Sequence, residues 1–307
     1  MKHFQNSKGT FTLFCNLLAG VFLLLVFTVA ASAAPPEQSS RKVQKFFSGT
    51  NQEVIVYTIH GENPGPTLLI FAGIHGDERA CPLVAVKYSH IKLKTGNLII
   101  VPRLNATALQ KKKRYGLGGD MNRLFNQPEN SKNPDMKVVN LAKSLIEKAD
   151  YVVNMHQGDG FYSPIWVDSK RNPTRWGQCN VIDAPNFDLP NGEKLELEKF
   201  AERVAKKTNA KIKDVKFHFQ VNNTNTESEN TIHKVQRRSL TYYAVTKEHK
   251  VAIALEATKN CTSAQATSFL MTAINAVIEE IGIIPEEFPS ESPSPSDKKS
   301  KKTKAKG

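Results

Sequence analysis

Runs of apolar, β-branched residues alternate along this chain with segments in which apolar residues recur at helical spacing. The runs expected to form strands are Val54–Tyr57, Thr67–Phe71, Asn97–Val101, Tyr151–Met155 and Val251–Leu255. The segments expected to form helices are Cys81–Ile91, Met136–Lys148, Leu195–Lys207 and Ala264–Ile281. Strands that alternate with helices predict an α/β fold, a single domain with a mixed, largely parallel twisted sheet and helices on both faces.

The two ends of the chain differ in composition from its middle. Residues 1–33 combine early lysines, a nearly continuous apolar run and the small residues Ala31-Ser32-Ala33, a pattern typical of a cleaved secretory signal peptide. An uncleaved anchor is the alternative, because about 20 apolar residues can span a bilayer. We expect a polar linker over 34–48, a folded domain over 49–284 and a disordered, lysine-rich tail over 285–307.

Positive charge is concentrated at those ends. The formal net charge is +13, but two lysines precede the apolar run and six lie in the last ten residues, which leaves +5 for the rest. The folded part is therefore only moderately basic, and we expect no nucleic-acid partner. The tail after Lys298 could hold anionic surfaces by charge alone, although a solubilising extension explains it more simply.

Three cysteines follow the expected signal peptide, namely Cys81, Cys179 and Cys261. An odd number permits at most one internal disulfide and leaves one thiol over. The spacing contains no Cys-x-x-Cys pair, which argues against a thiolate metal cluster or a redox motif. The sequence does not choose among the pairings.

Histidine and glutamate side chains, both common metal ligands, follow three of the expected strands. His75 and Glu78 come after Thr67–Phe71, His156 follows the strand ending at Met155, and Glu256 follows the strand ending at Leu255. Two imidazoles and a carboxylate are a common zinc ligand set that leaves a fourth position open for water. Taken singly, each has an ordinary interpretation: a buried structural histidine, or a glutamate in a salt bridge. We expect the other histidines to be structural or surface residues: His60, His90, His218, His233 and His249.

The order of these residues along the chain carries a resemblance. His75-x-x-Glu78, Arg114, Asp120-Met121-Asn122-Arg123, His156 and Glu256 resemble, in that order, the zinc carboxypeptidase/aspartoacylase superfamily over about residues 50 to 282. The string from His156 to Phe161 looks most like the periplasmic peptidoglycan D,L-carboxypeptidases that determine cell shape in curved and helical bacteria. Some members of that subgroup have Gln as first zinc ligand, where this chain has His75.

The resemblance implies a role for each matched residue. His75, Glu78 and His156 would hold one zinc ion per chain, and Glu256 would act as the general base and later as the general acid. Arg114 would stabilise the oxyanion, with Arg103 as the competing candidate.

Six side chains are candidates for contacts with the substrate. Asn122 and Arg123 would bind the terminal carboxylate of the substrate. We expect Asp159 and Tyr162 to line the pocket, and either Tyr242 or Tyr243 to place a phenol over it.

These residues together predict an exported, periplasmic zinc metallocarboxypeptidase that trims the peptide stems of peptidoglycan. One alternative is an exported N-acyl amino-acid deacylase that uses the same zinc and Glu256 on a small substrate. Another is a catalytically silent wall-binding module, against which the presence of all four of His75, Glu78, His156 and Glu256 argues. The scissile bond and the oligomeric state stay open at this level.

Overall fold

The computed structural model describes residues 38–290. The expected signal peptide and the lysine-rich part of the expected tail lie outside these residues. Within 38–290, no helix is both long enough and apolar enough to cross a bilayer.

The main sheet is mixed, and its centre is parallel. Its strands lie in the order β1-β2-β4-β3-β5-β12-β8-β11, with β13 paired to β4. Neighbours from β4 through β3 and β5 to β12 are parallel, and the antiparallel pairs are β1 with β2, β2 with β4, β12 with β8, and β13 with β4. Its strands are β1 (Ser40–Phe46), β2 (Val54–His60), β3 (Asn63–Phe71), β4 (Leu93–Val101), β5 (Tyr151–Gly158), β8 (Cys179–Ile182), β11 (Gln220–Asn223), β12 (Val251–Thr258) and β13 (Ile284–Pro285).

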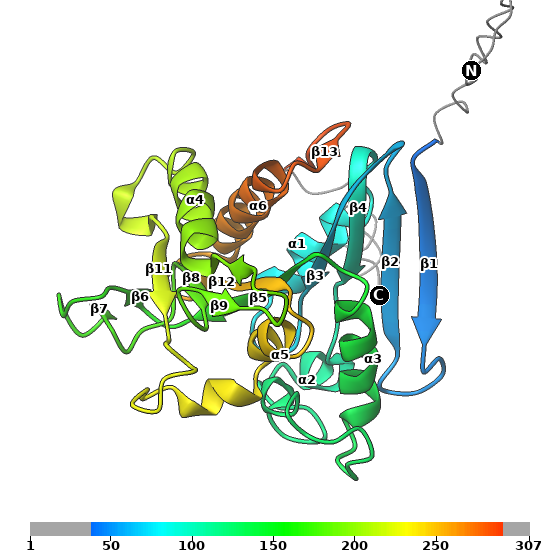
Figure 1. Cartoon of the computed structure of the whole chain (residues 1–307), viewed down its shortest axis with the longest axis horizontal. Helices are drawn as coiled ribbons and strands as arrows, with labels where there is room; N and C mark the ends of the chain where they lie inside the picture. Colours follow the sequence, from blue (N-terminus) through cyan, green and yellow to red (C-terminus); the bar gives the residue numbers. More distant parts are fainter. Residues whose placement is uncertain (1–37, 291–307) are drawn as a thin grey trace, which may run out of the picture. The chain divides into compact units, whose positions relative to one another are not determined.

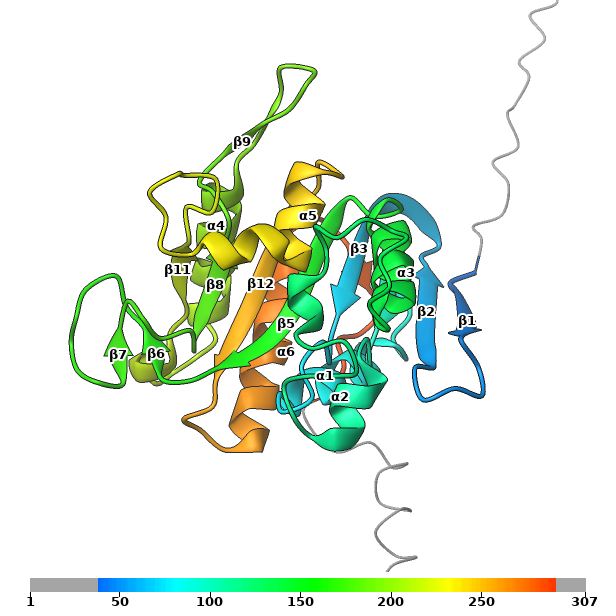
Figure 2. The same cartoon turned by 90° about the horizontal axis from the view of Figure 1, so that it is seen from below.

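Two short strand pairs project from this sheet (Figures 1 and 2). They are β6 (Phe161–Tyr162) with β7 (Arg171–Asn172), and β9 (Phe187–Asp188) with β10 (Lys194–Leu195).

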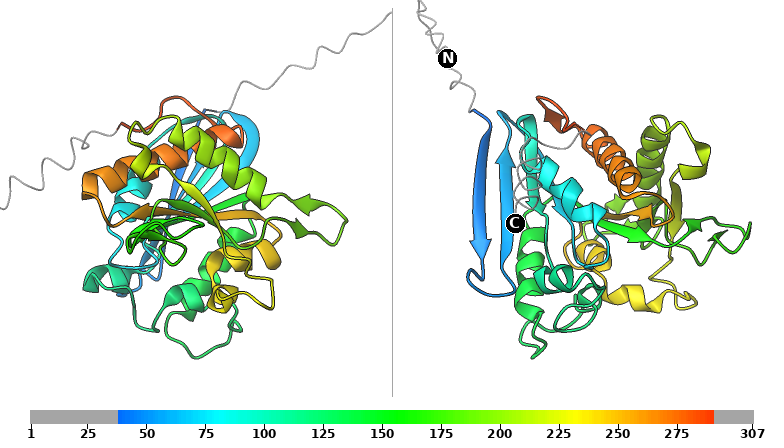
Figure 3. Two further views of the ribbon diagram at one scale, coloured as in Figure 1. Left: turned by 90° about the vertical axis from the view of Figure 1, so that its left-hand side faces the viewer. Right: turned by 180° about the vertical axis from the view of Figure 1, so that it is seen from behind.

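Helices cover both faces of the main sheet, as the left view of Figure 3 shows. Helices α1, α4 and α6 pack together on one face, and α5 packs against β5 and β12 from the other. The α-helices are α1 (Ala80–Tyr88), α2 (Ala106–Lys111), α3 (Met136–Ile146), α4 (Leu197–Asn209), α5 (Leu240–Thr246) and α6 (Ser263–Glu280). The 3-10 helices are η1 (Met121–Arg123), η2 (Val215–Phe217) and η3 (Lys234–Arg238).

Burial on both faces explains why the sequences of the central strands are nearly continuous apolar runs. Residues 152–156 of β5 and 252–255 of β12 are all buried, because helices cover these strands from both sides. The predicted fold class is therefore confirmed, and each expected strand and helix is present with its ends shifted by a few residues.

Both expected domain boundaries need correction. The structure places β1 inside the expected linker, where Ser40–Phe46 pairs residue by residue with Val54–His60. This strand is mostly exposed and carries Arg and Lys, as edge strands often do, so it lacks the apolar pattern of a buried strand. At the other end, Pro285 belongs to β13 and the Glu286 amide donates to the Lys92 carbonyl, so ordered structure continues past residue 284.

All three cysteines in the described part are free thiols. Cys81 lies in α1 and Cys179 in β8, both buried, whereas Cys261 is partly exposed. The single disulfide that the count permitted is not formed.

Helices α1 and α6 are joined by a buried hydroxyl. The Tyr88 hydroxyl donates to the Met271 carbonyl at 2.9 Å and also bonds the Asn275 side chain. We expect Tyr88→Phe to lower the free energy of unfolding by about 1–3 kcal/mol, because a buried acceptor loses its donor. Urea unfolding measures this loss. The matched control is Tyr115→Phe at an exposed site, which should change stability little; equal effects of the two substitutions would contradict the account.

Candidate active site

The expected site residues meet at the carboxyl ends of β3, β5 and β12. The chain passes from β3 through α1 to β4 on one side, and later returns to β5 on the other side of β3. Open α/β sheets bind ligands at such a switch in strand order, outside the carboxyl ends of the strands. His75 and Glu78 come from the loop after β3. His156 and Glu256 lie near the carboxyl ends of β5 and β12, where the two residues are direct partners in the parallel pairing of these strands.

Close backbone packing shapes the loop after β3. A Cβ atom at Gly76 would lie 1.9 Å from the Ala108 carbonyl oxygen in α2, so only glycine fits there. The Gly76 amide donates to the Lys113 carbonyl at 3.0 Å. At the end of the loop, the Gln157 side chain of β5 accepts from the Ala80 amide at the start of α1. These contacts fix the segment between them, which carries His75 and Glu78.

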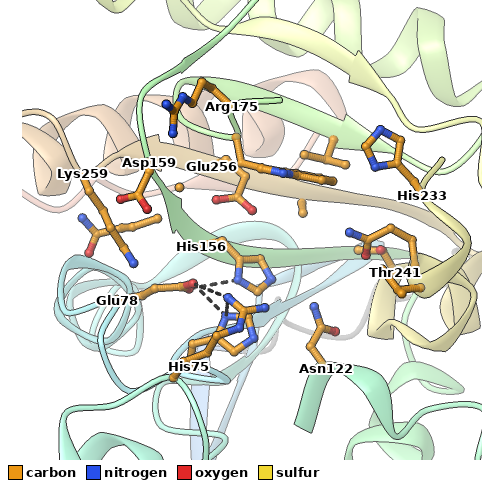
Figure 4. A pocket seen from close by; sticks show the side chains of 18 of the residues that line it. His75, Glu78, Asn122, His156, Asp159, Arg175, His233, Thr241, Glu256 and Lys259 are labelled. Carbon is orange, nitrogen blue, oxygen red and sulfur yellow. Dashed lines mark hydrogen bonds and ion pairs between the residues drawn. The ribbon is translucent and has the colours of Figure 1, made fainter. Parts of the chain in front are cut away.

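Two imidazoles converge on one buried carboxylate (Figure 4). His75 Nδ1 lies 2.7 Å from Glu78 Oε1, and His156 Nδ1 lies 2.9 Å from Glu78 Oε2. One ligand atom from each of the three residues lies within 4.8 Å of the others, and all three side chains are buried. This cluster has the donor types and the proximity that a metal ion requires.

The pKa values of the cluster show how tightly its charges interact. Burial opposes the charge on Glu78, but the two adjacent imidazoles outweigh it and hold the pKa of this carboxyl well below its usual range. Burial likewise lowers the pKa of His75, yet the Glu78 charge and hydrogen bonds to Asp120 and Glu78 raise it to about 9. Burial keeps the pKa of His156 below its usual value.

Asp120 joins the cluster to Arg114, a role that the sequence reasoning did not assign. Its Oδ1 lies 3.1 Å from His75 Nε2, and its Oδ2 accepts from Arg114 Nε and Nη2 at 3.2 and 3.0 Å. A carboxylate on the outer nitrogen of a histidine fixes the ring and leaves the inner nitrogen free for a metal. Arg114 thereby reaches within 3.9 Å of Glu78, whereas the competing Arg103 is exposed and does not line the cavity.

Asn122 and Arg123 lie in η1, directly after Asp120, which caps this turn by accepting from the Asn122 amide. Asn122 Oδ1 accepts from the Leu240 amide at the start of α5, and Arg123 Nη1 donates to the Asn122 carbonyl at 2.8 Å. Both side chains line the same cavity as the cluster. An amide and a guanidinium are suitable groups for a carboxylate ligand.

Glu256 faces the cluster from β12, and Figure 4 shows its carboxylate directed toward the same space as the His156 ring. Its Oε2 is buried and makes no hydrogen bond within residues 38–290. Burial, together with the nearby Glu78 charge, raises the pKa of Glu256 well above its usual value. A carboxyl group in this state is suited to proton transfer.

These residues border one cavity of about 420 Å³. As expected, Asp159 lines it. Tyr162 instead packs against the small apolar cluster around Cys179 and is not among the lining residues. The expectation for Tyr242 and Tyr243 is wrong: their hydroxyls bond Glu227 and Glu248, and they border a different cavity.

Several lining residues were missed from the sequence. His233, which we expected to be structural, lines the cavity and packs edge-on against Trp176 with ring centres 5.3 Å apart. Thr241 and Asp183 also line it. They come from loops and short elements that lack a strong pattern, so the sequence offered no signal for them beyond their polarity.

Residues 50–290 match the family described as the catalytic domain of the carboxypeptidase controlling helical cell shape. The chain belongs to this family. The match covers every residue of the cluster and supports a peptidase function. No curated protein sequence matches the chain.

Solved structures agree with the family assignment. The diaminopimelate-bound form of Helicobacter pylori Csd4, a D,L-carboxypeptidase, is 30% identical with a TM-score of 0.67, over 73% of this chain and 52% of that chain. The tripeptide-bound form of the same protein is 27% identical with a TM-score of 0.68, over 84% and 58%. This chain therefore spans little more than half the length of Csd4.

A more distant structure shares the fold alone. The succinylglutamate desuccinylase/aspartoacylase from Rhodobacter sphaeroides is 17% identical with a TM-score of 0.54, over 86% of this chain and 71% of that chain.

Asp120 offers a direct test of the site. Asp120→Asn removes the charge from both the His75 and the Arg114 contacts, and we expect zinc affinity to fall by about 10- to 100-fold. Competition with a chelator of known affinity measures this change. The control is Asp159→Asn, which removes an exposed carboxylate from the same cavity and should leave zinc affinity nearly unchanged. Unchanged affinity in Asp120→Asn would show that His75 does not need this partner.

Proposed function

We propose that this protein is an exported zinc carboxypeptidase that removes the terminal residue from the peptide stems of peptidoglycan. The observation that carries the proposal is the convergence of His75, Glu78 and His156 in a cavity that also holds Glu256, in a chain of the cell-shape carboxypeptidase family. The sequence pattern of residues 1–33 supports export to the periplasm, where these stems are found.

Three side chains of the cluster fit a zinc ion. Each imidazole presents Nδ1 toward Glu78, and Asp120 occupies the outer nitrogen of His75, so the inner nitrogens are the available donors. Nitrogen and carboxylate oxygen are the donors of catalytic zinc sites. When bound, zinc supplies a positive charge that activates water for attack on a carbonyl carbon.

Glu256 is proposed to move the proton. Its carboxylate takes a proton from the attacking water and then passes it to the nitrogen of the leaving group. The uncommitted Oε2 and the raised pKa of Glu256 both support this assignment. Arg114 stabilises the negative charge that develops on the substrate oxygen, while Asp120 holds the guanidinium in place.

Asn122 and Arg123 are proposed to bind the terminal carboxylate of the substrate. Burial lowers the pKa of Arg123, and so do the nearby charges of Arg114 and Arg238; Arg123 and Arg114 both line the cavity. A peptide stem ends in a carboxylate, which suits this part of the cavity. The tripeptide bound in one Csd4 structure supports the same class of substrate.

Digestion of purified muropeptides by the zinc-loaded protein tests the proposal. We expect mass spectrometry to show the loss of one terminal amino acid from the peptide stem. Hydrolysis of N-acyl amino acids alone would point instead to a deacylase. Binding of muropeptides without turnover would point to a silent wall-binding module, and either result would overturn the proposal.

Glu256→Gln separates proton transfer from metal binding. Glutamine keeps the size of the side chain but does not accept a proton at neutral pH, so we expect turnover to fall by about 100-fold or more while zinc stays bound. Kinetics, zinc content and thermal unfolding are measured on one sample, with Glu202→Gln on the exposed face of α4 as control. Near-normal turnover at full zinc occupancy would exclude Glu256 as the base.

His156→Ala tests the metal ligands. Only two protein ligands would remain, so we expect the variant to lose the single zinc ion of the wild-type protein while keeping its fold, since the core does not depend on the metal. Elemental analysis measures the metal, and circular dichroism follows the fold. His90→Ala, at an exposed position, is the matched control and should keep its zinc. Full zinc content in His156→Ala would mean that the third ligand is a different residue.

A further inference from the structure

Residues 160–176 form a lobe that projects from the main sheet (Figures 1 and 2). The lobe is built on the β6–β7 strand pair, and the loop between these strands carries three consecutive apolar side chains. Ile165, Trp166 and Val167 are 68%, 66% and 55% exposed. Single exposed apolar residues are ordinary, but a run of three on a projecting loop exposes apolar surface that folding alone does not require.

Hydrogen bonds within the lobe fix the shape of this loop. The amides of Val167 and Asp168 both donate to the Arg171 carbonyl at 3.0 Å. The buried Asn172 donates through Nδ2 to the Asp168 carbonyl at 2.8 Å, and its Oδ1 accepts from the Thr174 amide at 2.9 Å. The apolar side chains are therefore held outward by an ordered backbone, and an ordered surface loses little entropy when it binds a partner.

Another exposed apolar side chain lies next to the lobe. Arg171 Nη2 donates to the Lys216 carbonyl at 2.7 Å, which joins β7 to η2. Lys216 Nζ lies 5.6 Å from the ring centres of both Phe161 and Phe217. Val215, in the same helix η2, is 73% exposed. The lobe and the segment 211–217 are thus neighbouring parts of one surface.

Positive charge accompanies these apolar side chains. Residues 160–176 and 211–217 contain six basic side chains and two acidic ones, a net charge of +4. The two acidic side chains accept from nearby backbone amides, Asp168 from Lys170 and Asp214 from Lys216. Among residues 38–290, none of the six basic side chains forms an ion pair. The six are Lys170, Arg171, Arg175, Lys211, Lys213 and Lys216.

An anionic lipid surface matches both features. Tryptophan and aliphatic side chains enter the boundary between headgroups and acyl chains, while lysine and arginine are attracted to the lipid phosphates. A sugar polymer fits less well, because sugar hydroxyls need hydrogen-bonding side chains beside the aromatic ring, and Ile165 and Val167 flank Trp166. A protein partner also fits less well, since lysine is depleted at protein–protein interfaces and four of the six basic side chains are lysines.

We propose that the lobe binds anionic phospholipid bilayers, with Trp166 and its two apolar neighbours inserted at the level of the headgroups. Thr174 and Arg175 of the same lobe line the active-site cavity, so binding would hold the active site close to a membrane surface. The inference goes beyond the proposed reaction and shares with it only the export of the chain. Trp166 does not line the cavity, so membrane binding and catalysis can be tested separately.

Fluorescence of Trp166 tests the insertion directly. The chain has two tryptophans, and Trp176→Phe leaves Trp166 as the only one. The zinc-loaded exported form, without residues 1–33 so that their apolar run cannot insert, is mixed with vesicles of phosphatidylglycerol that have brominated acyl chains. We expect the emission of Trp166 to shift to shorter wavelength and to be quenched, and vesicles of phosphatidylcholine alone to have a much smaller effect.

Two outcomes of this experiment would overturn the inference. Vesicles that bind the protein without quenching Trp166 would show that another surface, such as the lysine-rich tail, makes the contact. The absence of any binding to phosphatidylglycerol would also exclude the lobe as a membrane-binding surface.

Trp166→Ala measures the contribution of the apolar loop. We expect its partition coefficient onto phosphatidylglycerol vesicles, measured by co-sedimentation, to fall by about 10- to 100-fold, the scale of burying one large apolar side chain. The matched control is Leu83→Ala in α1, which removes a side chain that is 55% exposed and should leave the partition coefficient unchanged. Equal losses in the two variants would contradict the inference. Circular dichroism checks the fold, and if Trp166→Ala fails to fold, the quenching experiment decides.

Lys170→Glu tests the charge of the lobe. We expect binding to phosphatidylglycerol vesicles to weaken by about 5-fold or more at low salt, and by less at raised salt. Lys45→Glu changes the net charge of the protein by the same amount in β1, on the opposite side of the molecule from the lobe in Figure 1. Equal losses in the two variants would show that net charge alone drives the binding, which would contradict the inference.

Muropeptide digestion separates this inference from the proposed function, because the vesicle experiments contain no substrate. We expect Trp166→Ala to lose vesicle binding and to hydrolyse soluble muropeptides at the wild-type rate. If Trp166 inserts into vesicles but no muropeptide is hydrolysed, the proposed reaction is wrong and the inference stands. If the emission of Trp166 responds to soluble glycan strands and not to vesicles, the lobe binds sugar and the inference is wrong.

Discussion

The buried Glu78 carboxylate between two imidazoles is the interaction on which the site depends. A carboxylate at this depth is stable only if positive or hydrogen-bonding groups surround it, and here His75 comes from its own loop and His156 from β5. The parallel arrangement of β3 and β5 brings those two segments together, and the glycine at position 76 allows the loop to approach α2. The proximity of the three ligand residues thus depends on both the sheet topology and the close packing at Gly76.

Charges of opposite sign alternate outward from that centre. Asp120 lies behind His75, and Arg114 lies behind Asp120, so each charge is compensated by the next. Glu256 and Asp183 stand apart from this chain of contacts: one carboxylate has an oxygen without a partner and the other has only neutral donors. Side chains that the fold leaves uncompensated in a cavity are the ones available for protons and substrate.

The sequence alone predicted the fold class and the residues that gather at the strand ends, because the buried parallel strands have strong apolar patterns and the motif residues follow them. It did not predict β1, whose exposed edge lacks such a pattern, or the cavity wall formed by Trp176, Asp183 and Thr241. These side chains come together from short elements far apart in the chain, and such proximity has no local signature. The sequence also did not show that the hydroxyls of Tyr242 and Tyr243 form hydrogen bonds with Glu227 and Glu248 outside the site.

Diffraction at the zinc absorption edge, from crystals grown with the metal, tests the central claim most directly. The account predicts one anomalous peak per chain, bound by Nδ1 of His75, Nδ1 of His156 and the Glu78 carboxylate, with Asp120 still on Nε2 of His75 and Glu256 outside the ligand set. A peak bound by other residues would contradict the account, as would full zinc content in the crystal with no peak in this cluster.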